Sequence, residues 1–274
     1  MSSEQTVAQQ APEQRTLASP SVLEDLKRLR ERSPLTHCIT NIVVTGFTAN
    51  VLLALGASPA MVIAVEESPG FAAVADALLI NVGTVTSSDV DSMIGAARSA
   101  LQSGTPWVLD PVAVGPLHYR TELVGRLLEY QPSVIRGNGS EILALAGVAT
   151  GGKGADSTAG SAEAVRGAQE LASRTGAVVA VSGEVDYVTD GSEVVAVPGG
   201  HVLLTKVTGT GCALGAVIAA FLAVSDSPLE GALSASAVFA AAGERAAAQS
   251  RGPGGLASAL LDNLYLIGQA EQPR

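Results

Sequence analysis

Residues 77–110 read ALLINVGTVTSSDVDSMIGAARSALQSGTPWVLD. Two apolar runs of strand length, at 77–81 and 107–110, flank a stretch at 89–103 in which apolar residues recur with helical spacing. A strand, a helix and a second strand in this order predict two parallel strands joined by a helix. We therefore expect this part of the chain to lie inside an α/β sheet.

The same alternation continues on both sides of this unit. Further strand-length runs occur at 60–64, 133–136 and 178–182, and further helical stretches at 121–130 and 161–175. Runs at 187–189 and 194–197 enclose Asp190-Gly191, which suits a hairpin turn, so an antiparallel edge is expected there. With no internal repeat or linker, the pattern predicts a layered, mostly parallel α/β fold in one domain over residues 21–274.

Composition and charge limit the ligands. The chain has 274 residues, 47% apolar and 3% aromatic, which is enough for a sizeable core. The formal net charge of -10 and the lack of a Lys/Arg run argue against a nucleic-acid partner, because binding phosphates along a strand needs a clustered basic surface. An anionic ligand such as ATP must be held locally, by a few cations, backbone N–H groups and a metal ion.

The sequence indicates a reduced, cytoplasmic setting. Cys38 and Cys212 have no CxxC or Cys/His spacing around them, so neither a disulfide framework nor a structural zinc site is expected. Residues 1–20 are polar and predict a disordered tail, not a signal peptide. The most apolar stretch, 213–224, is about twelve residues long, short of the roughly 18 to 20 that cross a bilayer, so it predicts a buried helix.

Several predicted strands end in polar or glycine residues. These ends are Asn81-Val82-Gly83, Asp110-Pro111, Arg136-Gly137-Asn138 and Ser182-Gly183-Glu184. The carboxyl ends of parallel strands line the ligand crevice of α/β sheets, which predicts a single polar edge. The alternative, that loops simply need polar turn residues, explains the glycines better than the aspartate and the arginine.

The strongest local motif is Thr208-Gly209-Thr210-Gly211-Cys212, which precedes an apolar helix. Free N–H groups at a helix start favour an anion, so the motif indicates phosphoryl transfer. The alternative is a loop capped by Thr210. A dinucleotide-binding turn is disfavoured because the motif lies late in the chain, and Gly151-Gly152-Lys153-Gly154 lacks the Walker A spacing.

Four other residues are candidates for chemistry, each with an ordinary alternative. A helix N-terminus would lower the pKa of the Cys212 thiol and make it a base, although a free cysteine is usually a small buried hydrophobe. Asp110 and Glu141 could orient Mg²⁺, yet Asn138 and Glu141 also have the spacing of a capping box. Arg136 suits a nucleotide phosphate, or else a surface ion pair.

The three histidines, His37, His118 and His201, are dispersed without partner spacing. We interpret them as structural or loop residues, and we assign no histidine metal site.

Together, several segments resemble the hydroxyethylthiazole kinases. They are Pro34–Asn41, Phe47–Asn50, Leu52–Pro59 with Met61, Asn81–Thr84, Leu109–Val112, Ile135–Asn138, Gly183–Asp186 and Leu204–Cys212, in that order. The resemblance runs from about residue 33 to the last predicted helix. It departs from the family at Gly46, where asparagine is frequent, and at Ser182, where threonine is common; either hydroxyl can donate to a phosphate.

The resemblance implies a ribokinase-like three-layer fold and ATP-dependent phosphorylation of 4-methyl-5-(2-hydroxyethyl)thiazole on its primary hydroxyl, a salvage step toward thiamine. Its implied site residues are Asn41, Met61 and Gly209 for the thiazole, Arg136, Ser182, Thr208 and Gly211 for ATP, Asp110 and Glu141 for Mg²⁺ through water or phosphate, and Cys212 in place of the aspartate base of sugar kinases. It also implies a homotrimer with sites between subunits, with residues 45–61 as the shared wall.

Two kinds of alternative remain. A hydroxymethylpyrimidine kinase or a nicotinamide-nucleotide repair dehydratase would share the fold but is expected to carry aspartate at position 212. A catalytically silent nucleotide-binding protein would not need Asp110, Arg136, Glu141 and Cys212 together.

Overall fold

The computed structural model describes residues 12–147 and 161–269. In this part of the chain, nine strands form one sheet in the order β1-β9-β8-β7-β6-β5-β4-β2-β3. The strands are β1 (Glu13–Gln14), β2 (Leu35–Ile39), β3 (Ser58–Ala60), β4 (Ala77–Asn81), β5 (Trp107–Asp110), β6 (Val134–Asn138), β7 (Val178–Ser182), β8 (Asp186–Thr189) and β9 (Val194–Val197). The helices are α1 (Pro20–Arg32), α2 (Thr45–Leu55), α3 (Ser68–Val74), α4 (Ser87–Ser103), α5 (His118–Leu128), α6 (Gly139–Ala146), α7 (Ser161–Thr175), the 3₁₀ helix η1 (Val202–Lys206), α8 (Thr210–Leu222), α9 (Pro228–Gln249) and α10 (Pro253–Leu266).

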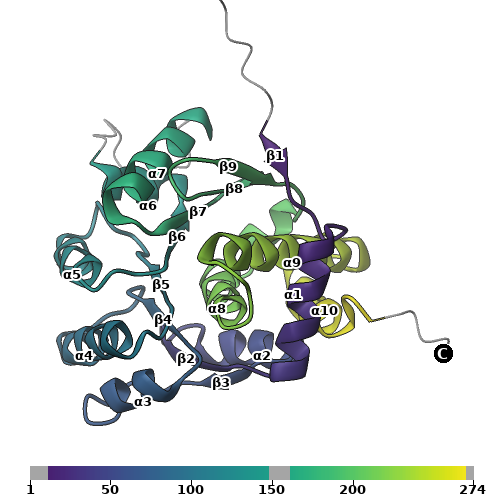
Figure 1. Ribbon diagram of the computed structural model, residues 1–274. Helices are drawn as coiled ribbons and strands as arrows, with labels where there is room; N and C mark the ends of the chain where they lie inside the picture. Colours follow the sequence, from purple (N-terminus) through teal and green to yellow (C-terminus); the bar gives the residue numbers. More distant parts are fainter. Residues whose placement is uncertain (1–11, 148–160, 270–274) are drawn as a thin grey trace, which may run out of the picture.

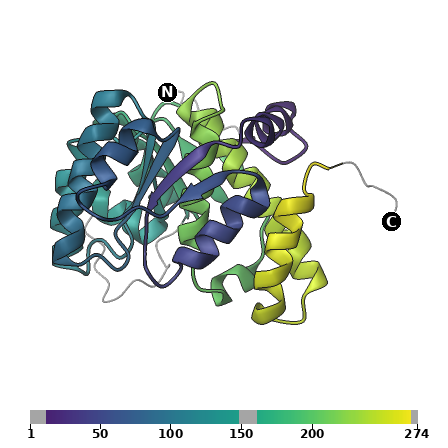
Figure 2. The same ribbon diagram turned by 90° about the horizontal axis from the view of Figure 1, so that it is seen from below.

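Helices cover both faces of the sheet, which gives three layers. Helices α3 to α7 lie on one face and α1, α2, α8, α9 and α10 on the other (Figure 1). Seen from below, α10 lies beside α2, with which it makes extensive contacts (Figure 2). The sheet separates two hydrophobic cores, one against each helical layer. The predicted layered α/β fold is confirmed.

The predicted unit at 77–110 is present as β4, α4 and β5. The strands are parallel, and their register pairs Leu78 with Trp107 and Asn81 with Asp110. A capping box of Thr86 and Asp89 starts α4, and Gly104 ends it with φ 75°. The predicted antiparallel edge is also confirmed, because β7 pairs with β8 and β8 with β9 in opposite directions.

Helix α8 contains most of the apolar stretch at 213–224 and is buried on nearly every side. It packs on β4 and β5 and against α9, so every face of the helix meets other protein atoms. This position explains its all-round apolar sequence and confirms the predicted buried helix. Within residues 12–147 and 161–269, no helix is long and apolar enough to cross a membrane.

The strand predicted at 60–64 is wrong. The edge strand β3 ends at Ala60, and the apolar residues after it leave the sheet, with Ile63 45% and Val65 44% exposed. An apolar run predicts a buried strand only when a neighbouring strand covers it, and β3 pairs with β2 over just Ser58–Ala60. The apolar pattern does not predict β2, whose residues are singled out only within Pro34–Asn41, one of the segments that resemble the hydroxyethylthiazole kinases.

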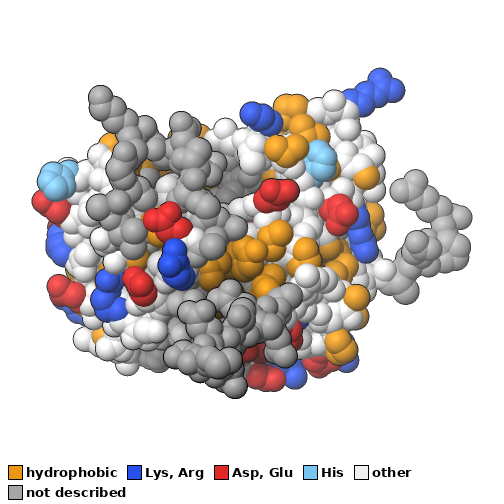
Figure 3. All heavy atoms as spheres, turned by 90° about the horizontal axis from the view of Figure 1, so that it is seen from above, with side chains coloured by type: hydrophobic (Ala, Val, Ile, Leu, Met, Phe, Trp, Pro, Cys, Tyr) orange, Lys and Arg blue, Asp and Glu red, His pale blue; other side chains and the backbone are white. Residues whose placement is uncertain are grey.

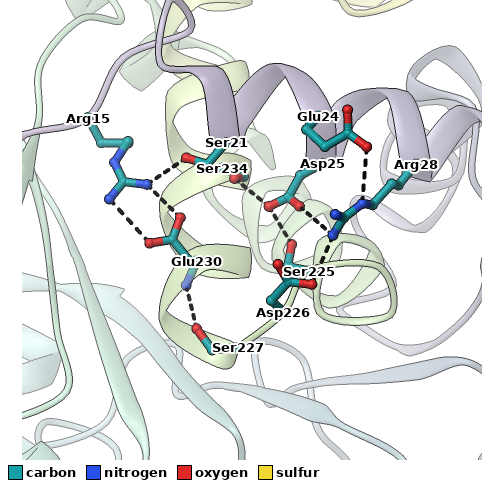
Figure 4. A network of polar contacts seen from close by, with 10 residues as sticks. All are labelled: Arg15, Ser21, Glu24, Asp25, Arg28, Ser225, Asp226, Ser227, Glu230 and Ser234. Atoms are coloured by element: carbon teal, nitrogen blue, oxygen red, sulfur yellow. Dashed lines mark hydrogen bonds and ion pairs between the residues drawn. The ribbon is translucent and has the colours of Figure 1, made fainter.

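The N-terminal prediction is wrong for residues 13–20. β1 pairs in parallel with β9, and Arg15 donates to both carboxylate oxygens of Glu230 on α9. Close by, Asp25 of α1 accepts hydrogen bonds from Ser225 (2.7 Å) and Ser234 (2.8 Å), which ties α1 to α9 (Figure 4). Polar composition alone cannot reveal these partners, which lie about two hundred residues away in the chain. Residues 1–11 lie outside the described part.

On the face shown in Figure 3, the described Lys and Arg side chains lie dispersed among acidic ones and form no continuous basic patch.

Candidate active site

Parallel strands bring polar side chains to one edge of the sheet. β4, β5, β6 and β7 run in the same direction, so Asn81, Asp110, Asn138 and Ser182 all stand at carboxyl ends. Register pairs Asn81 with Asp110 and Asn138 with Ser182, so the predicted polar edge is present. In such a sheet this edge is the usual location of a ligand.

Arg136 connects the two halves of this edge. Its Nη2 donates to Ser182 Oγ at 2.7 Å, and its Nη1 lies 3.8 Å from Asp110 Oδ2. The residue is 8% exposed, so the alternative of a surface ion pair is wrong. A Cβ built on Gly211 would lie 3.1 Å from Arg136 Nη1, so the first turn of α8 lies against the guanidinium and a side chain at position 211 would press on it.

Asp110 is fully buried at the end of β5. Its Oδ2 accepts from Asn81 Nδ2 at 2.6 Å, whereas its Oδ1 has no hydrogen-bond partner within the described residues. Burial raises the pKa of Asp110 to about 7, and the negative charge of Glu141 adds to the rise, against the opposing effects of Arg136 and the Asn81 hydrogen bond. This carboxyl therefore exchanges a proton near neutral pH.

Glu141 forms the capping box with Asn138 that the spacing of the two residues allows. Its Oε2 accepts from the Asn138 backbone N–H at 2.9 Å, and Asn138 Oδ1 accepts from the Glu141 N–H at 3.0 Å, so the capping box of α6 is present. Its Oε1 accepts from the Ala113 N–H at 2.9 Å. Both carboxylate oxygens thus already hold backbone donors.

The carboxyl pair fits a magnesium ion that is bound largely through water. Asp110 Oδ1 offers a buried oxygen without a partner, and Glu141 lies close enough to shift the pKa of Asp110. The described residues contain no group of three or more His, Cys, Asp and Glu that could hold a metal. Mg²⁺ needs no such cage, because it takes one or two carboxylates together with water and phosphate oxygens.

The start of α8 is built on a glycine in the left-handed region. Gly209 is the N-cap residue, with φ 93°. A Cβ at this position would lie 2.3 Å from Val44 Cγ1, so a side chain there would collide with the start of α2. Thr210, by contrast, is engaged in structure, because its hydroxyl donates to Leu204 O at 2.9 Å.

Cys212 lies in the first turn of α8 and faces Asn41. Its Sγ accepts from Asn41 Nδ2 at 3.7 Å. The expected lowering of its pKa is wrong: burial raises the pKa of the Cys212 thiol, and the negative charge of Asp110 raises it further. Removal of the thiolate from water therefore outweighs the opposing effects of Asn81, Arg136 and Asn41, and Cys212 is a thiol at neutral pH.

The remaining predicted residues differ in their connection to this network. Met61 follows β3 at the same edge of the sheet and packs against the core beside α2 and α8. Thr208 is exposed in the turn before α8, and its hydroxyl makes no hydrogen bond within residues 12–147 and 161–269. The structure therefore brings Asn41, Asp110, Arg136, Ser182, Gly211 and Cys212 together and leaves Thr208 at the margin.

Asn81 and Gly83 are site residues to which the sequence motifs assign no individual role. Asn81 is 1% exposed, and its amide joins Asp110 to the Gly83 backbone N–H. A Cβ on Gly83 would lie 2.7 Å from Asn41 Nδ2 and 2.9 Å from Asn81 Oδ1, so glycine lets the two amides approach. The available signal was positional: Asn81 and Asp110 end neighbouring parallel strands in register.

Comparison with known proteins agrees with this geometry. The model of the hydroxyethylthiazole kinase family matches residues 26–270. The chain belongs to the hydroxyethylthiazole kinase family. A hydroxyethylthiazole kinase of Leptospira borgpetersenii serovar Hardjo-bovis (strain JB197) is 59% identical over 251 residues, covering 92% of this chain and 95% of the relative.

Two solved structures share the fold. The hydroxyethylthiazole kinase of Pyrococcus horikoshii OT3 superposes with a TM-score of 0.83 at 43% identity, covering 90% of this chain and 93% of that one. A ribokinase-like superfamily protein of Enterococcus faecalis V583 has a TM-score of 0.62 at 14% identity, covering 94% and 93%, and shows likeness of fold alone. This hydroxyethylthiazole kinase family member therefore has a ribokinase-like fold.

Proposed function

We propose that this family member transfers the γ-phosphoryl group of ATP to the primary hydroxyl of 4-methyl-5-(2-hydroxyethyl)thiazole, a salvage step toward thiamine. The observation that carries the proposal is the position of α8. Its first turn touches Arg136 at Gly211 and faces Asn41 at Cys212, so one helix start meets both a phosphate-binding cation and a polar group for an alcohol. Phosphoryl transfer needs the phosphate donor and the accepting alcohol to be bound side by side.

ATP would be held at the Arg136 side of the edge. The planar guanidinium and the Ser182 hydroxyl already share a hydrogen bond, which fixes the orientation of both donors. Thr208 and Gly211 contribute the exposed hydroxyl and a free N–H group at the helix start, where the dipole favours an anion.

Asp110 and Glu141 would hold Mg²⁺, with the free Asp110 Oδ1 as the available carboxylate atom and water between Glu141 and the ion. When bound, the ion neutralises charge on the phosphate oxygens. Asn81 keeps the Asp110 carboxyl oriented toward this position.

The thiazole alcohol would lie against Gly209, between Asn41 and Met61. The absence of a side chain at Gly209 admits Val44, which brings the start of α8 next to the start of α2, just after Asn41. Because the Cys212 thiol has a raised pKa, removal of the alcohol proton contributes little to the rate. Alignment of the hydroxyl and neutralisation of charge by Arg136 and the α8 amides contribute most.

The proposal includes a cytoplasmic homotrimer with sites between subunits. Exposed apolar side chains cluster in one region of the sequence: Ile42, Val43, Leu53, Ile63, Val65 and Val74. Ile42 is 78% and Val74 70% exposed, and all six lie in β2–α3, next to the strand ends that carry Asn41 and Met61. We call these six residues the exposed apolar residues of 42–74; burial between subunits would remove them from water.

The test is ATP-dependent phosphorylation by the purified protein on hydroxyethylthiazole and on hydroxymethylpyrimidine, each with Mg²⁺ and with chelator, with the phosphorylated alcohol followed by mass. Thiazole phosphate formed only with Mg²⁺ is the expected result. Product from the pyrimidine alone would show that hydroxymethylpyrimidine, and not the thiazole, is the substrate. No product from either alcohol would favour a repair dehydratase or a silent nucleotide binder.

A further inference from the structure

His37 is a buried histidine with an unusual set of neighbours. It lies in β2 beside Ala60 of β3 and has no exposed surface. Its Nε2 lies 2.7 Å from Val62 O, and its ring meets Phe71 of α3 edge-on, with centroids 5.1 Å apart and planes at 78°. The ring therefore contacts two points of the chain between β3 and α3.

The chemistry of this contact fixes the tautomer. A carbonyl oxygen only accepts, so Nε2 must carry the hydrogen and donate it to Val62 O. Nδ1 is buried and finds no partner among the described residues, so it has no acceptor for a second proton. Burial also lowers the pKa of His37, which keeps the ring neutral.

The segment that His37 holds has little other support. Residues 61–64 leave the sheet after β3 without regular structure. Apart from contacts within the strand ladder, no other hydrogen bond to the backbone of residues 61–63 is present in the described part of the chain. The segment's next backbone anchor is the turn at Ala64, whose carbonyl accepts from Ser68 N at 2.8 Å.

This segment carries Met61, whose side chain packs on the core shared with α2 and α8. Along β2, Cys38 faces that core while Ile39 belongs to the core on the opposite side of the sheet. By the alternation of a strand, His37 lies on the Ile39 side. Its bond to Val62 thus holds the backbone on the Ile39 side of the sheet, while the Met61 side chain packs on the core of the opposite side.

We propose that His37 is a positioning residue for the alcohol site: its Nε2–H bond to Val62 O fixes the Met61–Val62 wall against which the thiazole binds. The inference rests on the proposed function, because it takes Met61 as a thiazole contact. It assigns no proton transfer to His37 and predicts an effect on thiazole binding with none on ATP binding.

The test compares steady-state kinetics of the wild type with three variants. His37→Phe keeps a ring beside Phe71 but removes the donor; His37→Gln keeps an N–H at the same number of bonds from Cα. Thr36→Val is the matched control, because it removes a buried hydroxyl from the same strand. That hydroxyl donates to Pro34 O and not to Val62. Loss of the donor to the half-buried Val62 carbonyl is expected to raise the KM for thiazole about tenfold in His37→Phe, with kcat and the KM for ATP within about twofold.

The outcomes separate the alternatives. His37→Gln is expected to recover a thiazole KM within about threefold of the wild type, while Thr36→Val lowers the melting temperature without moving that KM. An unchanged KM in His37→Phe, or an equal rise in Thr36→Val, would overturn the positioning role. A wild type inactive on the thiazole would instead contradict the proposed function.

A second measurement covers the case in which His37→Phe does not fold. Nitrogen NMR of the wild type is expected to show the neutral Nε2–H tautomer of His37, and its signals should shift when the thiazole alcohol is added but not with ATP alone. Signals that stay fixed with saturating thiazole would contradict the inference.

Discussion

The Asp110 carboxyl shows how position in the fold changes the acidity of one group. Its pKa is raised to about 7, chiefly by burial. A carboxyl whose folded pKa exceeds its unfolded value binds more protons in the native state, so it favours folding at low pH, and this advantage disappears as the pH rises through 7. An aspartate whose pKa is lowered by folding behaves in the opposite way: its contribution to stability is present at neutral pH and is lost as the pH falls.

We expect the free energy of unfolding, measured in the presence of chelator, to depend on pH more in the wild type than in Asp110→Asn. Between pH 6 and pH 8, the wild type should lose about 1.4 kcal/mol more than the variant. Urea unfolding at several pH values measures this difference. The exposed Asp91→Asn is the control for loss of one charge. A difference that rises with pH would contradict the raised pKa.

Cys212 and Asp110 are expected to differ in their importance for the rate. Since the thiol has a raised pKa and phosphoryl transfer has a loose transition state, Cys212→Ser should stay within about tenfold of the wild-type kcat. Asp110→Asn removes charge at the proposed Mg²⁺ position and should lower kcat roughly a hundredfold or more. Single-turnover rates check the ranking, and a dead Cys212→Ser enzyme that still binds both substrates would reverse it.

Between elements, the starts of α2 and α8 approach each other at the site. Val44 is the N-cap residue of α2 and Gly209 that of α8, and the Val44 side chain occupies the space that a side chain at Gly209 would need. The contact fixes the distance between Asn41, just before α2, and Cys212 in α8. A change at either N-cap is therefore expected to act on both stability and substrate binding.

Gly209→Ala should lower the free energy of unfolding by about 2 to 3 kcal/mol, because a Cβ 2.3 Å from Val44 Cγ1 adds a collision to the strain of φ 93°. Gly104→Ala is the matched control: its φ is 75° but a Cβ there meets nothing within 4 Å, so about 1 kcal/mol is expected. Urea unfolding measures both variants. Val44→Ala should restore part of the loss in a double variant, and equal losses in the two alanine variants would argue against the collision.

For the whole molecule, the exposed apolar residues of 42–74 are a feature that assembly would cover. Leu53 on α2 is 59% exposed although its neighbours Val51 and Leu52 are fully buried. Asn41 and Met61 lie in or beside the same stretch of the chain, so in the proposed homotrimer assembly and substrate binding are expected to depend on each other.

Leu53→Glu should convert a trimer into smaller species and lower activity at the same time, because a charge buried between subunits has no partner there. Sedimentation velocity measures the mass. Leu101→Glu on α4, at a side chain 43% exposed on the other helical layer, is the control and should remain trimeric. A trimeric, active Leu53→Glu enzyme would place the interface elsewhere.

Much of the fold could be predicted because periodicity is a local property. The runs at 77–81, 107–110 and 178–182 became β4, β5 and β7 with the same bounds, and α7 also has its predicted bounds. The errors occurred where a partner distant in the sequence decided the outcome. β1 forms only because β9 is beside it, and residues 61–64 leave the sheet because no strand covers them.

The sequence by itself determined the layered α/β fold, the buried helix α8 with its glycine start, and the polar ends of the strands, since each depends on residue type and short-range spacing. Only the tertiary structure decided that Asn41 meets Cys212 across 171 positions, that Gly209 admits Val44, and that His37 holds Val62. It also decided the acidity of Asp110 and Cys212. Burial and charge act through space, and the spacing of residues along the chain does not fix which groups become neighbours or lose water.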